Sequence, residues 1–171
     1  VNNAWAFGGN TVSIYTDGYS MLQALMHEIS LARHHIHLQF YIFEDDAIGR
    51  LLRDLLIDKA RQGVKIRLLY DDVGCWRVDS MFYDQMLCEG IEVQSFLKVR
   101  FPRFTSKVNY RNHRKIAIID GRIGFIGGMN IAERYIKGFS WGIWRDTHVR
   151  MEGERGYMAC KSAFFDRLVC Y

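Results

Sequence analysis

The sequence contains a single proline, Pro102, and no segment rich in glycine, serine and proline, so it shows no interdomain linker. No apolar run approaches the ~18 residues that a membrane-spanning helix needs, and no signal peptide is visible. Cysteine is also scarce, and the spacings match no zinc-binding pattern, which favours reduced structural thiols over a metal site. The four cysteines are Cys75, Cys88, Cys160 and Cys170.

Apolar residues make up 49% of the 171 residues and charged residues 25%, which is the composition of a globular chain and excludes a disordered or fibrous one. The length fits one domain, residues 1–171, with a hydrophobic core. The chain begins at Val1 instead of methionine and stops at Tyr171 without a helix or strand breaker. We therefore expect a soluble fragment of a longer protein.

The charge is unevenly distributed. The net charge is +4, but residues 98–115 carry seven cations and no acid, so the rest of the chain carries −3. Phe101, Phe104 and Tyr110 are interleaved with these cations. A solvated basic loop is one interpretation. A binding site for an anion, such as a phosphate, a nucleic acid or an acidic lipid surface, is the other.

Hydrophobic periodicity predicts strands and helices in alternation over the first half of the chain. Residues 11–15, 36–43, 64–70 and 91–96 have strand patterns. Residues 20–34, a segment ending at Gly63, and residues 79–89 have helical patterns. This order predicts an α/β fold, with a mixed, mostly parallel sheet flanked by helices. Ligands of such sheets gather at the carboxyl ends of the strands.

Five acids follow the predicted strands, and two histidines share one strand face. The acids could bind a metal, but helix caps and solvated turns are the commoner roles of such residues. The histidines have no evident third ligand, which favours a structural role. We therefore expect neither a metal nor another cofactor. These residues are Glu44, Asp45, Asp46, Asp71 and Asp72, with His35 and His37.

A β-hairpin is predicted around Asp120-Gly121, which separates two apolar runs. A two-residue turn pairs Ile119 with Arg122 and therefore sets His113 opposite Gly128. Residues two apart on a strand share a face, as do directly paired residues. His113, Lys115, Gly128 and Asn130 should then project to one side. Ile116, Ile118, Ile123 and Phe125 should form a core layer on the other side.

That predicted face suits a phosphate. His113 and Lys115 lie about 6.6 Å apart along an extended strand. Lysine offers a point charge and Asn130 an amide donor. Gly128 leaves room opposite the imidazole, and Gly127 and Gly128 could present backbone N–H groups to an oxyanion. The position of Asp120 in the turn indicates a structural role.

The segment His113–Asp120, followed by Gly127-Gly128-Met129-Asn130, resembles the HxKxxxxD…GGxN signature (the HKD motif) of the phospholipase D superfamily at every defining position. Further segments are similar to one branch, the bacterial cardiolipin synthases, over roughly residues 12 to 160. They are residues 35–46, 69–74, 99–102, 109–115 and 144–148.

The resemblance implies a phospholipase D-like fold with the motif on the hairpin, and a metal-independent phosphodiester transfer through a phosphohistidine. His113 would be the nucleophile or its acid/base counterpart, since imidazole attacks when neutral and donates a proton when charged. Lys115 and Asn130 would bind the non-bridging oxygens. Asp146 occupies the place of the carboxylate that orients the histidine, although a surface salt bridge is the alternative.

In cardiolipin synthases one phosphatidyl group of phosphatidylglycerol is held by the enzyme, glycerol leaves, and a second phosphatidylglycerol accepts the group. We therefore expect an anionic phospholipid, phosphatidylglycerol, as substrate, and association of the parent protein with the cell membrane surface. Arg100 and Arg103 should help to hold the anionic headgroup. No nucleic acid is expected as a partner.

The active site of this family needs two facing motifs, and this sequence has one. A missing C-terminal half or a second subunit must supply the other. Three functions remain open: the phosphatidyltransferase, a homodimeric phospholipase D-type phosphodiesterase or nuclease, and a non-catalytic lipid-binding half. The isolated fragment is inactive or weakly active under the first of these.

Overall fold

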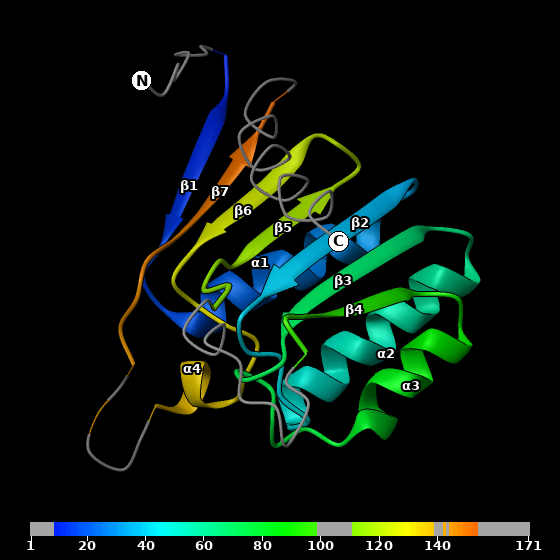
Figure 1. Ribbon diagram of the computed structural model, residues 1–171. Coiled ribbons are helices and arrows are strands. Elements are labelled where there is room, and N and C mark those ends of the chain that lie inside the picture. The colour runs from blue at the N-terminus through cyan, green and yellow to red at the C-terminus, as the bar shows by residue number, and fades with distance from the viewer. Residues whose placement is uncertain (1–8, 99–110, 139–141, 143, 154–171) are drawn as a thin grey trace, which may run out of the picture.

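The computed structural model describes residues 9–98, 111–138, 142 and 144–153. In chain order the elements are β1 (Thr11–Tyr15), α1 (Gly18–Leu31), β2 (His35–Phe40), α2 (Ala47–Arg61), β3 (Lys65–Asp71), α3 (Ser80–Cys88), β4 (Glu92–Phe96), β5 (Ile116–Ile119), β6 (Ile123–Gly127), α4 (Arg134–Lys137) and β7 (His148–Glu152). The seven strands within the described residues form one sheet in the order β1-β7-β6-β5-β2-β3-β4 (Figure 1).

The three longer helices begin at aspartates whose side chains cap them. Asp17, Asp46 and Asp79 each accept hydrogen bonds from backbone N–H groups two or three residues further along, at 2.8–3.0 Å. These bonds satisfy donors that a helix N-terminus leaves without intrahelical partners. Gly63 and Gly90, with φ of +89° and +80°, follow α2 and α3 and let the chain turn into the next strand. The predicted helices are therefore confirmed, with bounds shifted by a few residues.

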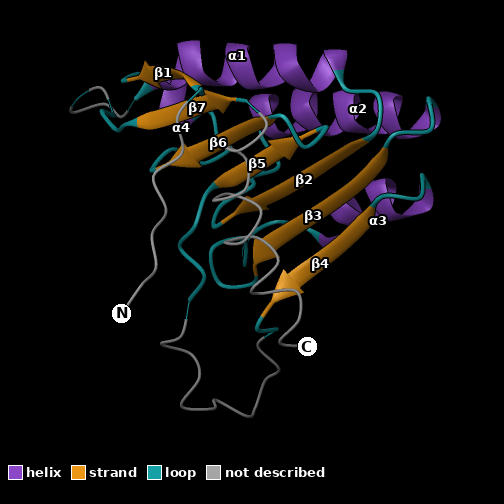
Figure 2. Ribbon diagram, turned by 90° about the horizontal axis from the view of Figure 1, so that it is seen from above, coloured by secondary structure: helices purple, strands orange, loops and turns teal. Residues whose placement is uncertain are grey.

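The helices α1, α2 and α3 all cover one face of the sheet (Figure 2). The core lies between this layer and the strands. Its centre is formed by side chains of α1, α2 and β2 that are fully or almost fully buried. They include Leu25 and Ile29 of α1, Leu52 and Leu56 of α2, and Ile36, Leu38 and Phe40 of β2. The site described below is therefore carried by a packed scaffold.

The prediction of a mostly parallel sheet is wrong. Only β2, β3 and β4 run parallel to one another. After β4 the chain returns to the other side of β2, where β5 pairs antiparallel with β2, and β6, β7 and β1 continue antiparallel. The alternation of strands and helices in the first half predicts parallel pairing there, but it does not extend to the hairpin half of the sheet.

The hairpin of β5 and β6 is confirmed, but its predicted register is off by one residue. Ile119 pairs with Ile123 instead of Arg122, so three residues form the turn. Asp120 and Gly121 both have positive φ, at 50° and 64°. The Asp-Gly pair indicates a hairpin but does not determine the loop length.

Because of this register, Ile123 and Phe125 share a face with Ala117 and not with Ile116. Ile123 and Phe125 belong to the core cluster together with Ala117 and Ile119. The predicted core layer that combined Ile116 and Ile118 with Ile123 and Phe125 is therefore wrong. None of the helices among the described residues is sufficiently long and apolar to cross a membrane.

Candidate active site

His113, Lys115 and Asn130 of the motif lie at one edge of the sheet, the edge toward which the arrow of β2 points (Figure 1). His113 and Lys115 precede β5, which begins where β2 ends because the two strands are antiparallel. The segment 127–130 lies at the end of β6, and residues 146–148 lie at the start of β7. The site therefore lies at the edge where the parallel strands also end, as ligand sites of such sheets do.

Lys115 is a buried cation, with 1% of its surface exposed. Its ammonium donates a hydrogen bond to the carbonyl oxygen of His113 at 2.6 Å, and it lies 5.5 Å from the centre of the Tyr41 ring. Burial lowers the pKa of Lys115 to about 8, partly offset by the negative charge of Asp146. A buried ammonium with few protein partners is well placed to bind an anion that enters the site.

His113 is exposed, and its ring lies against Tyr41 with 4.7 Å between the ring centres. Partial burial and the positive charge of Lys115 lower the pKa of His113, while Asp71 and Asp146 act in the opposite direction. The imidazole is therefore mainly neutral near pH 7, which leaves a nitrogen lone pair available for attack on an electrophile.

Asp146 occupies the space that the missing side chain of Gly128 leaves open. A Cβ built on Gly128 would lie 2.0 Å from Oδ1 of Asp146 and 2.4 Å from Oδ2. The carboxylate also accepts a hydrogen bond from the N–H of Thr147 at 2.7 Å, and its charge acts on both His113 and Lys115. The prediction that Gly128 lies opposite His113 and leaves room for the imidazole is wrong. The observed register sets Lys115 opposite Gly127, so it does not pair His113 with Gly128, and the carboxylate of Asp146 fills the space at Gly128.

The two glycines do not present free N–H groups to a ligand, so that expectation is wrong. The N–H of Gly127 bonds to the carbonyl of Lys115 at 3.3 Å, and the N–H of Gly128 bonds to the carbonyl of Thr147 at 3.0 Å. Gly127 allows the backbone at the start of β7 to approach β6 closely, because a Cβ on Gly127 would lie 2.5 Å from the Cα of His148. Pairing with neighbouring strands satisfies these donors.

Asn130 is buried, and both ends of its carboxamide have protein partners. Its Oδ1 accepts a hydrogen bond from the N–H of Ile42 at 3.0 Å. Its Nδ2 donates to the hydroxyl of Tyr135 at 2.5 Å. These bonds orient the amide and tie the end of β2 to α4. A primary amide carries two N–H donors, so the second remains to be offered to a ligand.

Asp120 lies in the turn, at the opposite end of the hairpin from His113. Its carboxylate accepts hydrogen bonds from the N–H groups of Arg33, His34 and His35 at 2.7–2.9 Å. These bonds lower its pKa against the opposing effect of burial. The carboxylate fastens the hairpin to the start of β2, and such bonds to a charged acceptor contribute about 1.5–3 kcal/mol each.

Asp71 positions the segment that carries His113, a role that the sequence did not reveal. The carboxylate is 1% exposed and accepts hydrogen bonds from the N–H groups of Val73, Gly74 and Asn112 at 3.0 Å each. In the sequence, the only signal for Asp71 was its position at the end of a predicted strand. That position indicated a helix cap, a solvated turn or a metal ligand. In the described residues, no three His, Cys, Asp or Glu side chains are placed to bind a metal.

His148 and Tyr41 also lie at the site without having been predicted there. His148 is completely buried, and neither ring nitrogen has a hydrogen-bond partner in the described part of the chain. Burial lowers its pKa to about 4. Tyr41 follows β2 directly and contacts both His113 and Lys115. The sequence pattern placed Tyr41 inside the strand predicted over residues 36–43, whereas β2 ends at Phe40, and its place in the family-like segment 35–46 was the available signal.

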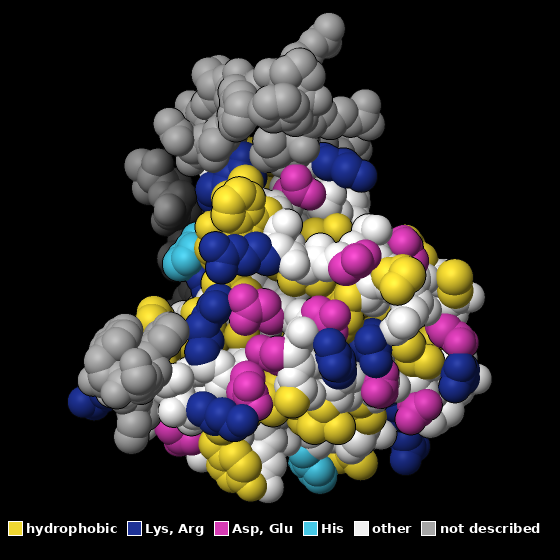
Figure 3. Space-filling model, turned by 90° about the horizontal axis from the view of Figure 1, so that it is seen from below, with side chains coloured by type: hydrophobic (Ala, Val, Ile, Leu, Met, Phe, Trp, Pro, Cys, Tyr) yellow, Lys and Arg dark blue, Asp and Glu magenta, His cyan; other side chains and the backbone are white. Residues whose placement is uncertain are grey.

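Arg100 and Arg103 lie outside the described residues, so their predicted role stays a prediction. Seen from below (Figure 3), basic and acidic side chains lie next to one another on the described surface instead of separating by sign. Ion pairs among the described residues include those of Arg134 with Glu44 and Arg50 with Asp45.

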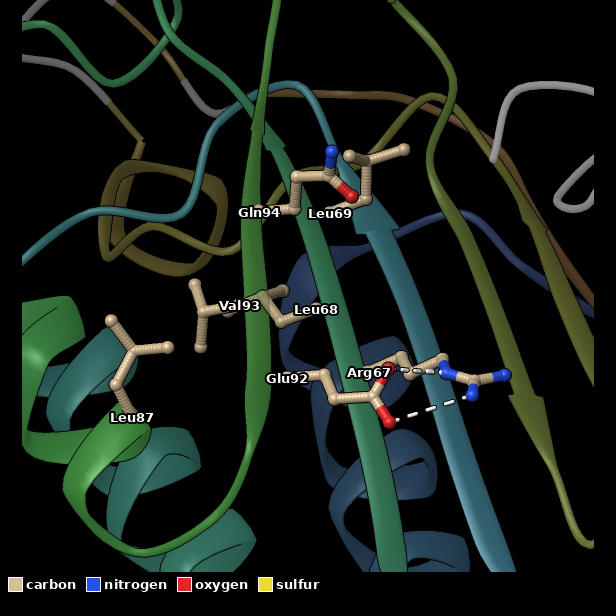
Figure 4. A pocket seen from close by; sticks show the side chains of 7 residues that line it. All are labelled: Arg67, Leu68, Leu69, Leu87, Glu92, Val93 and Gln94. Atoms are coloured by element: carbon tan, nitrogen blue, oxygen red, sulfur yellow. Dashed lines mark hydrogen bonds and ion pairs between the residues drawn. The ribbon is translucent and has the colours of Figure 1, made fainter. Parts of the chain in front are cut away.

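A cavity of about 230 Å³ lies at the far side of the sheet, between β3, β4 and the end of α3 (Figure 4). Its lining includes Leu87, Val93 and the ion pair of Arg67 with Glu92, whose closest atoms are 2.7 Å apart. None of the motif residues lines it. Its one cation is already neutralised by a carboxylate, so this cavity lacks the chemistry of an anion site.

Comparison with known sequences identifies relatives over most of the chain. The family described as "Cardiolipin synthase, PLD-like domain" matches residues 25–139. A cardiolipin synthase of Geobacillus kaustophilus is 43% identical over 143 residues, which are 83% of this chain and 28% of that protein. The major cardiolipin synthase of Bacillus subtilis is 42% identical over 154 residues, or 89% of this chain and 32% of that protein. The chain thus spans about 30% of the length of these relatives.

Two solved structures share the fold. NucT from Helicobacter pylori has a TM-score of 0.71 at 18% identity, covering 94% of this chain and 96% of that one. Nuc from Salmonella typhimurium, a phospholipase D family member, has a TM-score of 0.70 at 16% identity, covering 94% and 95%. This likeness confirms the predicted phospholipase D-like α/β fold.

Proposed function

Because the chain belongs to the cardiolipin synthase family of phospholipase D-like domains, we propose that it supplies one of the two histidine motifs of a phosphatidyltransferase that makes cardiolipin. Family membership confirms the resemblance predicted from the segment 113–130. The observation that carries the proposal is the convergence of His113, Lys115 and Asp146 at one edge of the sheet, with charges that act on one another.

The proposed reaction has two steps. A histidine nitrogen attacks the phosphorus of phosphatidylglycerol, a nitrogen–phosphorus bond forms, and the bond from phosphorus to the glycerol oxygen breaks. The leaving oxygen takes a proton from the histidine of the facing motif. The hydroxyl of a second phosphatidylglycerol then attacks, gives its proton to that same histidine, and releases the first histidine.

The lowered pKa of His113 supports the nucleophile role for this residue, since only the neutral imidazole attacks. Lys115 neutralises a non-bridging oxygen whose charge grows during transfer, and the second N–H of Asn130 donates to the same group. Asp146 lies where it favours the imidazolium that forms on protonation. The second motif comes from another part of the parent protein or from a second subunit, and the parent protein acts at the membrane surface.

Phosphatidylglycerol turnover tests the proposal. The full-length protein is incubated with vesicles of phosphatidylglycerol labelled in the glycerol headgroup and in the phosphate. We expect diphosphatidylglycerol to accumulate with one glycerol released for each molecule formed. Glycerol release without diphosphatidylglycerol would identify a phosphodiesterase instead. Absence of any lipid turnover would remove the proposed function.

A second candidate is a phosphodiesterase or nuclease completed by a second copy of the chain. The observation that favours it is the coverage of NucT and Nuc, since about 95% of each of those chains matches this one. In those two structures, a phospholipase D-like fold of about this size makes up almost the whole chain. Cleavage of a labelled oligonucleotide, with no phosphatidylglycerol turnover, would favour this candidate.

The pKa of Lys115 predicts an alkaline limit of the activity. Since its pKa is about 8, the ammonium is charged below that pH and loses its proton above it. We expect kcat/KM for phosphatidylglycerol to fall about tenfold per pH unit above pH 8, while kcat falls only at higher pH, because the bound phosphate stabilises the charged form. Rates measured between pH 6 and 10 check this prediction.

Lys115→Arg provides the control for that pH profile. A guanidinium stays charged throughout this range, so the variant should have lower activity but lose the alkaline limit near pH 8. An unchanged alkaline limit in Lys115→Arg would assign it to another group and contradict the prediction.

A further inference from the structure

A second cavity of about 230 Å³ adjoins the motif. Its walls come from the segment after β2, from the loop between β3 and α3, and from Arg134 of α4. Gly74 allows this loop to pack against the β2 segment, because a Cβ there would lie 2.0 Å from the carbonyl oxygen of Tyr41. The cavity is thus built from three segments that are distant in the sequence. We propose that it binds the short polyol of the substrate alcohol, a glycerol unit.

The cavity shares a wall with the motif. Tyr41 lines the cavity and also contacts the His113 ring and the Lys115 ammonium. Ile42, the next lining residue, donates its N–H to Asn130. His113, Lys115 and Asn130 do not line the cavity themselves, so Tyr41 and Ile42 connect it to the motif. In the proposed arrangement the alcohol occupies this cavity, and the phosphate to which it is esterified, or which it attacks, lies at the motif beyond Tyr41.

The charged residues in the wall are Glu44, Arg134 and Arg77, and the ion pair of Glu44 with Arg134 suits hydroxyl groups. Glu44 and Arg134 form an ion pair at 3.0 Å, and about a third of each side chain remains exposed. A hydroxyl donates to a carboxylate and accepts from a guanidinium, so adjacent hydroxyls can satisfy both partners at once. A phosphate in the same place would meet the negative charge of Glu44.

The size and the rim of the cavity fit a glycerol unit carried by a lipid. A cavity of roughly 150 Å³ accommodates benzene, which has six heavy atoms, as glycerol does. Trp76 also lines the cavity and is 75% exposed, with the Arg77 guanidinium 5.8 Å from its ring centre. An exposed indole beside a cation is suited to the polar surface of a bilayer. These features favour a lipid headgroup over free glycerol.

This inference rests on the proposed function, and it assigns selection of the alcohol to the Glu44–Arg134 pair. It predicts that the motif holds the phosphate while the Glu44–Arg134 pair holds the polyol. Changing the pair should therefore alter how often the enzyme-bound phosphatidyl group is passed to an alcohol instead of water. Loss of hydrogen bonds that only the alcohol makes affects transfer to the alcohol selectively.

The test measures transfer and hydrolysis in the same reaction. Phosphatidylglycerol vesicles are incubated with the full-length protein and labelled free glycerol, and three products are followed: labelled phosphatidylglycerol, diphosphatidylglycerol and phosphatidic acid. In Glu44→Gln and Arg134→Gln we expect the ratio of alcohol transfer to hydrolysis to fall about tenfold, the effect of losing one hydrogen bond to a charged group. A fall confined to diphosphatidylglycerol would assign the cavity to the lipid-borne glycerol, and an equal fall in both would assign it to either source.

Asp45→Asn is the matched control. Asp45 pairs with Arg50 at 2.6 Å on the neighbouring surface and does not line the cavity. The ratio should be unchanged in this variant. Equal ratios in all variants, or equal falls in transfer and hydrolysis, would overturn the inference. Thermal unfolding of each variant shows whether any effect comes from loss of structure.

A binding measurement separates this inference from the proposed function. Adding glycerol should shift the indole N–H resonance of Trp76 in the wild-type protein, and Glu44→Gln should weaken that response about tenfold. This readout needs no turnover. If the wild-type protein turns over no lipid but binds glycerol here, the proposed function fails alone. If it turns over phosphatidylglycerol and Trp76 does not respond, the cavity assignment fails alone.

Discussion

Replacing His113 with glutamine should lower the turnover of phosphatidylglycerol by about 10⁴-fold or more, the size of effect seen when a catalytic nucleophile or its proton-transfer partner is removed. A carboxamide neither forms the nitrogen–phosphorus bond nor carries a proton near pH 7. Because His113 is exposed and its ring contacts Tyr41, the substitution should leave the free energy of unfolding almost unchanged. Rates of glycerol release and urea unfolding curves measure the two effects.

His27→Gln is the control for this substitution, since His27 lies on α1 and its side chain is exposed. It should retain wild-type turnover. Rapid acid-free quenching with phosphate-labelled lipid should also yield an acid-labile, base-stable protein label that is lost in His113→Gln. Turnover within tenfold of wild type in His113→Gln would contradict a role for this residue in the chemistry.

Replacing Gly128 with alanine should lower kcat/KM by about 10²-fold while the fold persists, because small displacements of catalytic groups have effects of that size. The new Cβ would lie 2.0 Å from Oδ1 of Asp146, so the carboxylate must move away. Since the charge of Asp146 raises the pKa of His113, its displacement should lower that pKa further. The acid limit of the pH profile should then shift to lower pH, because neutral His113 persists there.

Gly127→Ala provides the contrast. Its Cβ would meet backbone atoms of the neighbouring strand, the Cα of His148 and the carbonyl oxygen of Thr147, both at 2.5 Å. Backbone cannot rotate away, so β6 and β7 must separate and the free energy of unfolding should fall by about 1–3 kcal/mol. If Gly128→Ala loses activity but keeps the acid limit of the wild-type protein, Asp146 does not act on His113. That result would contradict the prediction.

The local elements of the fold were predictable from the chain because their signals are short in range. Aspartates before helical periodicity, glycines after it and an Asp-Gly pair between apolar runs act on neighbouring residues. Three helices and the hairpin follow from them. The direction of β5 relative to β2 depends on where a distant segment docks, and no local pattern encodes it. The expected mostly parallel sheet failed for that reason.

The motif residues were identifiable, but their partners were not. The resemblance of His113, Lys115, Asp120 and Asn130 to the signature of the phospholipase D superfamily implied phosphodiester chemistry. The hydrogen bond between Ile42 and Asn130 joins residues 88 positions apart, and that between Asp71 and Asn112 joins residues 41 apart. Such contacts exist only once the sheet has assembled.

The sequence by itself therefore determined which chemical groups are present: an imidazole, an ammonium and a carboxamide at defined spacings, on elements that form from local signals. Only the tertiary structure decided how that chemistry is supported. It set Asp146 over Gly128, used the N–H groups of both glycines in strand pairing, and placed a polar cavity beside Tyr41. The reason is physical, since residue type sets what a group can do, whereas long-range packing sets its neighbours, its burial and hence its pKa.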